Sequence, residues 1–107
     1  MKLDKKVILS ELKQKLSTHL GGNLKDVVLF GSQLTNKATP DSDYDILIVL
    51  KSNPDWKVER KISDICYEID LQYGIITDTH LITEQETESL RGKQPIFHNA
   101  LTNGYHV

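Results

Sequence analysis

The sequence predicts an α/β protein of the α+β type, with a small mixed sheet and helices packed against it. Two short, continuously apolar runs at 27–30 and 46–50 are typical of strands that are covered on both faces. Apolar residues at helical spacing lie before the first run and after the second. The expected order is therefore helix, strand, strand, helix, strand, helix, helix.

Length and composition limit the classes of protein that the chain can belong to. The 107 residues suffice for one core, so we expect a single domain over 1–107. A net charge of −2 lacks the basic excess of nucleic-acid-binding proteins, so no direct nucleic-acid partner is expected. Cys66 is the only cysteine, and no apolar segment approaches the roughly 20 residues of a membrane span. A cytoplasmic location without a membrane partner is expected, and self-association is left open.

The first predicted helix begins near Asp4, which can cap it, and ends at Gly21-Gly22. Its apolar stripe consists of leucines at spacings of three and four: Leu9, Leu12, Leu16 and Leu20. Such a stripe is typical of a helix that packs on a sheet. The first strand is expected to follow at 25–30.

A long second helix is predicted from Trp56 to about Leu71, capped by Asp55 and ended by Gly74. Cys66 falls on its apolar stripe and is expected to pack in the core. Trp56 is expected to pack at the edge of the helix start.

Three further elements are predicted in the remainder of the chain. They are a strand at 75–82, a short helix at 84–90 and a last helix from Pro95 to about Thr102. Thr83 and Glu86 have the spacing of a capping box for the short helix. Pro95 suits the first turn of the last helix, and Gly104 is its expected stop.

Two carboxylates open the second apolar run. Alternate side chains of a strand point the same way, so Asp43 and Asp45 share a face of the strand predicted at 43–50. Two carboxylates this close repel each other, and a bound divalent cation removes the conflict. Mg²⁺ favours a few carboxylates together with substrate phosphates. The pair therefore predicts a Mg²⁺ site beside a phosphate-bearing substrate.

The first apolar run ends in Gly31-Ser32, and a loop rich in turn-forming residues follows at 36–42. A glycine lets the backbone approach a phosphate closely, and free N–H groups in such a turn can donate to an anion. The Ser32 hydroxyl adds another donor. A Gly-Ser pair often arises by chance, and so do two aspartates spaced two apart. Only their combination with the two apolar strands is specific enough to predict a functional site.

The stretch LFGSQLTNKATPDSDYDILIVL, residues 29–50, resembles the signature of the DNA polymerase beta-like nucleotidyltransferase superfamily. It is similar in particular to minimal, single-domain nucleotidyltransferases of bacteria and archaea. The resemblance implies transfer of a nucleoside monophosphate, with AMP from ATP expected, to an acceptor hydroxyl. It also implies that Gly31 and Ser32 hold the nucleotide phosphates, and that Asp43 and Asp45 bind the metals of a two-metal Mg²⁺ site.

Members of this superfamily usually carry a third acid on a following core strand. Asp78 is the acid within the third predicted strand and is our candidate for a catalytic, metal-binding residue. Asp70 is the alternative, although its place near a helix end fits an ordinary solvated acid. His80 would share a strand face with Asp78, and we expect it to be a surface or otherwise satisfied histidine.

The sequence departs from the superfamily pattern directly after Gly31-Ser32. Relatives often carry arginines there, whereas this chain reads Gln33, Leu34, Thr35 and Asn36. Fewer cations weaken the binding of a triphosphate, so slow, partner-dependent or absent activity stays open.

Two hypotheses about function follow from the resemblance. In the first, the protein is an enzyme whose acceptor is presented by a partner, such as a tyrosine of a helical HEPN-type toxin. In the second, it is a catalytically weak or inactive binding module that acts as an antitoxin by contact alone.

Overall fold

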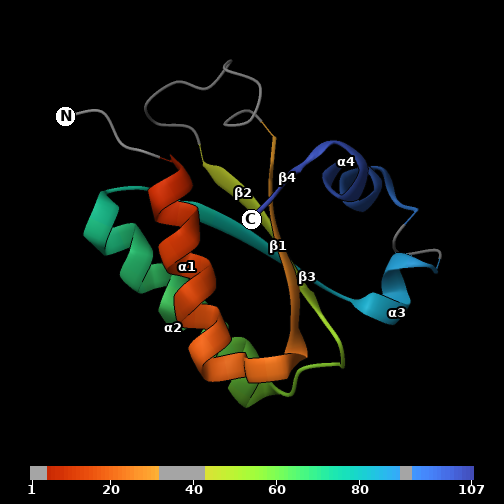
Figure 1. The fold of residues 1–107 in the computed structure, drawn as a ribbon, viewed down its shortest axis with the longest axis horizontal. Coiled ribbons are helices and arrows are strands. Elements are labelled where there is room, and N and C mark those ends of the chain that lie inside the picture. The colour runs from red at the N-terminus through yellow and green to blue at the C-terminus, as the bar shows by residue number, and fades with distance from the viewer. Residues whose placement is uncertain (1–4, 32–42, 90–92) are drawn as a thin grey trace.

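The computed structural model describes residues 5–31, 43–89 and 93–107. Figure 1 shows a sheet between two helical layers, with α1 and α2 on one side and α3 and α4 on the other. The elements in chain order are α1 (Lys5–Leu20), η1 (Gly21–Asn23), β1 (Leu24–Phe30), β2 (Tyr44–Leu50), α2 (Trp56–Tyr73), β3 (Thr77–Thr83), α3 (Glu84–Thr87), α4 (Pro95–Asn103) and β4 (Tyr105–His106).

The described strands form one mixed sheet in the order β3-β2-β1-β4. The strands β2 and β3 are parallel and joined through α2, whereas β1 pairs antiparallel with both β2 and β4. The mixed sheet with packed helices that the sequence predicts is confirmed. The register places Phe30, the last residue of β1, opposite Asp45 near the start of β2.

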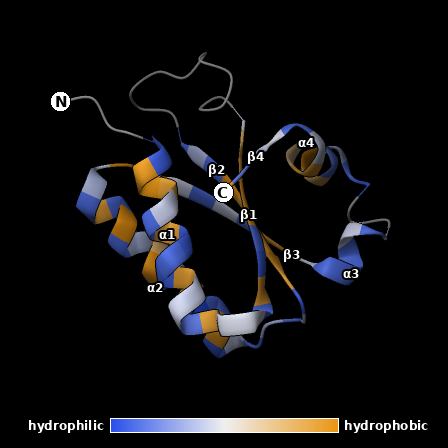
Figure 2. Cartoon of the chain, in the orientation of Figure 1, coloured by the Kyte–Doolittle hydropathy of each residue, from blue (hydrophilic) through white to orange (hydrophobic). Residues whose placement is uncertain are grey.

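Both faces of β1 and β2 are buried, as their continuous apolarity predicts. The larger core, between the sheet and α1 and α2, contains Ile8, Leu9, Leu12, Leu16, Val27, Leu29, Tyr44, Ile46, Ile48, Leu50, Ile62, Ile65, Cys66 and Ile69. The smaller core, on the α4 face, contains Val28, Phe30, Leu47, Val49, Ile82, Phe97 and Ala100. Figure 2 shows hydrophobic residues along the central strands between the two helical layers.

Three predicted helix caps are confirmed by the structure. The Asp55 carboxylate accepts a hydrogen bond of 2.9 Å from the Val58 N–H, which caps α2. Gly74 ends the same helix in the left-handed conformation with φ +66°. Thr83 and Glu86 form the capping box of α3. Asp4 lies outside the described residues.

Several details differ from the sequence predictions. Strand β2 begins at Tyr44 rather than at 43, so Asp43 lies just before it. The helix α3 ends at Thr87 rather than near 90, so it is a single capped turn. Strand β3 starts at Thr77, two residues later than predicted. The prediction that Trp56 packs at the helix start is wrong, because its side chain is 67% exposed and contacts the ammonium group of Lys57.

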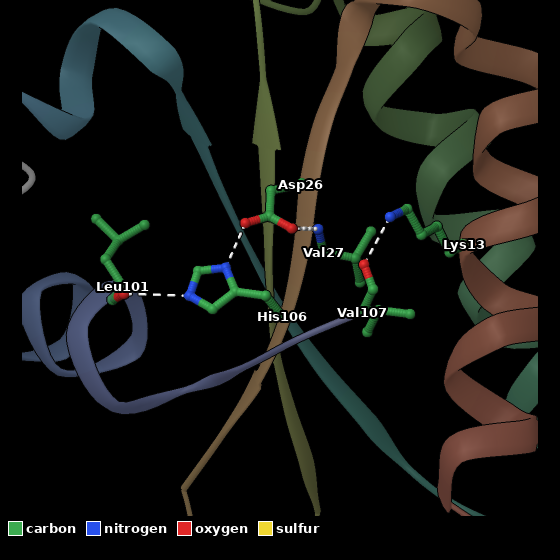
Figure 3. Close-up of polar contacts among 6 residues, drawn as sticks. All are labelled: Lys13, Asp26, Val27, Leu101, His106 and Val107. Carbon is green, nitrogen blue, oxygen red and sulfur yellow. Dashed lines mark hydrogen bonds and ion pairs between the residues drawn. The ribbon is translucent and has the colours of Figure 1, made fainter.

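No sequence pattern predicted β4, the two-residue strand after α4. The Val107 N–H donates to the Val27 carbonyl. Lys13 of α1 donates to the backbone oxygen of Val107 (Figure 3). Gly104 permits the strand to approach β1, because a Cβ there would overlap the side chain of Val28.

No helix in the described ranges is both long and apolar enough to cross a membrane.

Candidate active site

Two carboxylates meet where the parallel strands β2 and β3 begin. Asp45 and Asp78 are direct partners in the β2–β3 ladder. Leu47 and Val49 belong to the core on the α4 face, so Asp45 points to that face by the alternation of side chains. The sheet thus brings together two acids that lie 33 positions apart in the sequence.

His80 joins these two acids. Each of Asp45, Asp78 and His80 offers one ligand atom, and these atoms all lie within 4.8 Å of one another. The Nε2 atom of His80 lies 3.6 Å from Oδ2 of Asp78, which is longer than a hydrogen bond. The imidazole also contacts two aromatic rings, with centroid distances of 5.8 Å to Phe30 and 6.5 Å to Phe97.

The electrostatics of the cluster show that negative charge is concentrated there. Burial raises the pKa of the Asp45 carboxyl, and the charge of Asp78 raises it further. His80 acts in the opposite direction, and Asp43 adds a smaller increase. A divalent cation among these groups would remove the repulsion between the two carboxylates.

The backbone of Gly31 passes close beside Asp45. Gly31 has φ +80°, and a Cβ added there would overlap the Asp45 carboxylate. Only glycine combines this backbone conformation with this close approach. Gly31 therefore lies directly against the acidic cluster. Ser32 and the loop predicted at 36–42 lie outside the described residues.

Asp43 lies just outside the strand and outside the three-residue cluster. It is exposed and directly precedes Tyr44, whose N–H donates to the Ile76 carbonyl at the start of the neighbouring strand. Asp43 is near enough to Asp45 to raise the pKa of that carboxyl.

Asp70, the alternative third acid, has a different place. Its carboxylate accepts a hydrogen bond of 3.0 Å from the Thr77 N–H, so it joins the end of α2 to the first residue of β3. Burial raises the pKa of this carboxyl, whereas the hydrogen bonds from Thr77 lower it. Asp78 rather than Asp70 is the acid opposite Asp45.

The donor set of the cluster fits a divalent cation. Two carboxylates supply the hard oxygen ligands that Mg²⁺ favours, and an imidazole supplies a nitrogen. Two of these residues are paired in a rigid ladder, and the third follows two positions later on β3. Because open coordination positions would remain, phosphate oxygens of a substrate could complete the shell.

The role of His80 in this cluster is what sequence reasoning missed. Its position two residues after Asp78 was visible and indicated a shared strand face. The contact with Phe97 was not visible, because it depends on how α4 packs across the sheet. A surface or otherwise satisfied histidine was expected, and the structure shows a side chain that is only 28% exposed and adjoins both acids.

This fold and site define a class of protein. A mixed sheet that presents paired acids beside a glycine turn is suited to the transfer of a phosphate-bearing group. A model of the nucleotidyltransferase domain family matches residues 8–100, and the chain belongs to this family. The protein is therefore a nucleotidyltransferase, and the resemblance of residues 29–50 is confirmed.

Relatives of known sequence carry a more specific name. The chain is 32% identical over 102 residues to the candidate protein adenylyltransferase MJ1305 of Methanocaldococcus jannaschii, covering 94% of this chain and 68% of that protein. It is 38% identical over 69 residues to a second candidate protein adenylyltransferase of that organism, MJ0141, covering 64% of this chain and 70% of that protein.

Solved structures share the fold at lower identity. The spectinomycin adenyltransferase AAD(9) of Enterococcus faecialis, with ATP and spectinomycin, has a TM-score of 0.61 at 24% identity. The match covers 80% of this chain but 37% of that protein. A toxin-antitoxin with AMP-PNP has a TM-score of 0.57 at 19% identity, covering 89% and 68% of the two chains. A mutant of the toxin-antitoxin MntA-HpeT has a TM-score of 0.59 at 16% identity, covering 97% and 72%.

Proposed function

We propose that the protein transfers AMP from ATP to a hydroxyl group and depends on divalent cations, with Mg²⁺ as the expected ion. The observation that carries this proposal is the pairing of Asp45 with Asp78 in the ladder, beside the backbone of Gly31. The names of the two archaeal relatives support an adenylyl group as the group that is transferred.

Asp43, Asp45 and Asp78 would hold the catalytic cations, and Gly31 and Ser32 would hold the nucleotide phosphates. Bound cations would supply charge to polarise the α-phosphate and to lower the pKa of the acceptor hydroxyl. The carboxylates and their cations would position the α-phosphate. The absence of a side chain at Gly31 lets its backbone lie directly beside the Asp45 carboxylate.

The reaction is a displacement at the α-phosphorus. The acceptor oxygen forms a bond to this phosphorus while the bond to the bridging oxygen of the β-phosphate breaks. Pyrophosphate leaves with the electron pair, and the acceptor proton passes to solvent. The carboxylates contribute by positioning and electrostatics, because they are already oriented by the two strands.

The acceptor is proposed to be a tyrosine of a partner protein, namely a helical HEPN-type toxin. The fold that this chain shares with two toxin-antitoxin structures supports a protein partner. The names of the archaeal relatives support a protein as acceptor. The HEPN type and the tyrosine rest on the resemblance of residues 29–50 to minimal antitoxin transferases.

The test is a labelling experiment with ATP that carries ³²P at the α-phosphate. The protein is incubated with this ATP, MgCl₂ and the product of the neighbouring gene, and we expect label on the neighbour. Replacing Asp43 and Asp45 by Asn, or Asp78 by Asn, is expected to abolish it. Asp64→Asn, an exposed acid on α2, is the matched control and should label normally. Equal labelling by all variants would contradict the proposal.

The second candidate function is neutralisation of the partner by contact, without transfer. It is favoured by the sequence Gln33, Leu34, Thr35 and Asn36, which supplies no arginine for a triphosphate. In that case the double Asn variant should retain partner binding and biological effect, and calorimetry with ATP and MgCl₂ should detect no nucleotide binding.

A further inference from the structure

We propose that His80 is a nitrogen ligand of the active-site cation and shifts the preference of the site from Mg²⁺ towards a transition-metal ion such as Mn²⁺. This inference rests on the proposed function, because it concerns the same site. It goes beyond that function by naming an additional ligand and its effect on the choice of metal.

Donor atoms of three side chains converge at the acidic cluster. Ligand atoms of Asp45, Asp78 and His80 lie within 4.8 Å of one another, a spacing that an ion bound to all three can bridge. The Nε2 atom of His80 stands 3.6 Å from the Asp78 carboxylate, too far for a hydrogen bond. The imidazole is therefore directed at the acid while its nitrogen stays available to a cation between them.

Two aromatic side chains hold the imidazole of His80 in place. Phe30 at the end of β1 meets the ring at an interplanar angle of 51°, and Phe97 of α4 meets it edge-on at 88°. Two aromatic contacts from different elements restrict the rotation of the ring, and little entropy is lost when the nitrogen binds an ion. A histidine that only filled space on this face would not need a nitrogen beside two carboxylates.

The donor set combines two carboxylates with one imidazole. Mg²⁺ favours hard oxygen ligands, whereas imidazole suits first-row transition metals. Carboxylates suit Mn²⁺ as well as Mg²⁺. Mn²⁺ is the softer of the two ions, so it accepts an imidazole nitrogen more readily than Mg²⁺ does. With His80 in the shell, the protein's own residues would favour Mn²⁺ over Mg²⁺, although both ions carry the same charge.

The test uses Mn²⁺ with inorganic tripolyphosphate, which imitates the phosphate chain of a nucleotide but contains no nitrogen. Pulsed electron paramagnetic resonance of this complex with the folded protein should show coupling of Mn²⁺ to a directly bound ¹⁴N nucleus. His80→Leu, which keeps an apolar side chain in contact with Phe30 and Phe97, should abolish the coupling. His98→Gln, at an exposed position on α4, is the matched control and should leave it unchanged.

Calorimetry gives a second measurement on the same variants. His80→Leu should weaken Mn²⁺ binding by about tenfold or more, since even the loss of an outer-shell partner typically costs that much affinity. It should weaken Mg²⁺ binding less. His80→Gln, with a side chain of similar size and polarity, should lose the coupling too and guards against a folding defect of the Leu variant.

The outcomes separate this inference from the proposed function. Mn²⁺ that binds without nitrogen coupling, or a His80→Leu variant with unchanged affinities for both ions, would overturn the role of His80 and leave nucleotidyl transfer intact. If the protein binds neither ion in the presence of tripolyphosphate, the proposed function fails together with the inference.

Discussion

The imidazole of His106 bridges Asp26 of β1 and the Leu101 carbonyl of α4 (Figure 3). Its Nδ1 atom lies 2.5 Å from Oδ2 of Asp26, and its Nε2 atom lies 3.2 Å from the Leu101 oxygen. A carboxylate and a carbonyl can only accept hydrogen bonds, so the ring satisfies both when each nitrogen carries a proton. Hydrogen bonding to Asp26 accordingly raises the pKa of His106.

The docking of β4 is therefore expected to depend on pH. A histidine whose pKa is raised on folding contributes stability that is fully present below its unfolded value, about 6.5, and is lost as pH rises through the folded value. We expect His106→Gln to reduce the free energy of unfolding by up to about 1 kcal/mol at pH 6, because the pair is partly exposed. The deficit should shrink by pH 9.

Urea unfolding of both proteins at pH 6 and pH 9 measures this difference, and NMR titration of His106 gives its pKa directly. Asp26→Asn should also lower the pKa of His106 towards its ordinary range. A pKa of 6.5 or lower in the unmodified protein would contradict the prediction.

Gly31→Ala is expected to damage both the stability of the protein and its active site. The substitution adds a Cβ at φ +80° and forces it against the Asp45 carboxylate. Positive φ alone costs a non-glycine residue about 1 kcal/mol, and the overlap adds to this cost by moving the carboxylate.

Gly74→Ala is the matched control for Gly31→Ala, because Gly74 has φ +66° with open space around it. It should show the backbone cost without loss of cation binding. Cation binding by calorimetry and urea midpoints separate the two effects. Equal cation affinity in the two variants would show that the close approach of Gly31 to Asp45 does not matter for cation binding.

Asp70 is expected to act in positioning β3 rather than in binding a cation. Asp70→Ala removes the acceptor of the Thr77 N–H and should lower the free energy of unfolding by about 1–2 kcal/mol. Asp70→Asn keeps an acceptor oxygen and should lose less. Urea unfolding of both variants tests this prediction, and a larger loss for Asn than for Ala would refute it.

Cys66 should be inert in the folded protein. Burial raises the pKa of its thiol to about 12, with a further increase from the charge of Asp70. The thiolate is the reactive form, so a disulfide reagent such as DTNB at pH 8 should modify native Cys66 far more slowly than Cys66 of the protein in urea. Equal rates in the two conditions would show that the thiol is not buried.

The sequence predicted the elements whose signals are local and strong. The apolar runs at 27–30 and 46–50 each formed a buried strand, and Asp55, Gly74 and Thr83 ended or began helices as expected. Such caps depend on a few neighbouring residues, so the sequence alone contains the information needed to place them.

What the sequence could not provide depends on contacts between distant residues. A strand of two residues such as β4 has no alternation to detect, and its position follows from the approach of Gly104 to β1. The neighbours of His80 follow from ladder register and from helix packing, neither of which is encoded near position 80. Asp78 was predicted as the third acid, and its place opposite Asp45 required the structure.

The two cores on either side of the sheet are unequal, and the acidic cluster lies on the side of the smaller one. Separating α4 and β4 from the sheet would expose much less apolar surface than separating α1 and α2, so the free energy of such a local opening is lower. Backbone amides of α4 and β4 should therefore exchange with deuterium sooner than those of the two long helices. We therefore expect the face that carries the acids to open locally before the rest of the domain unfolds.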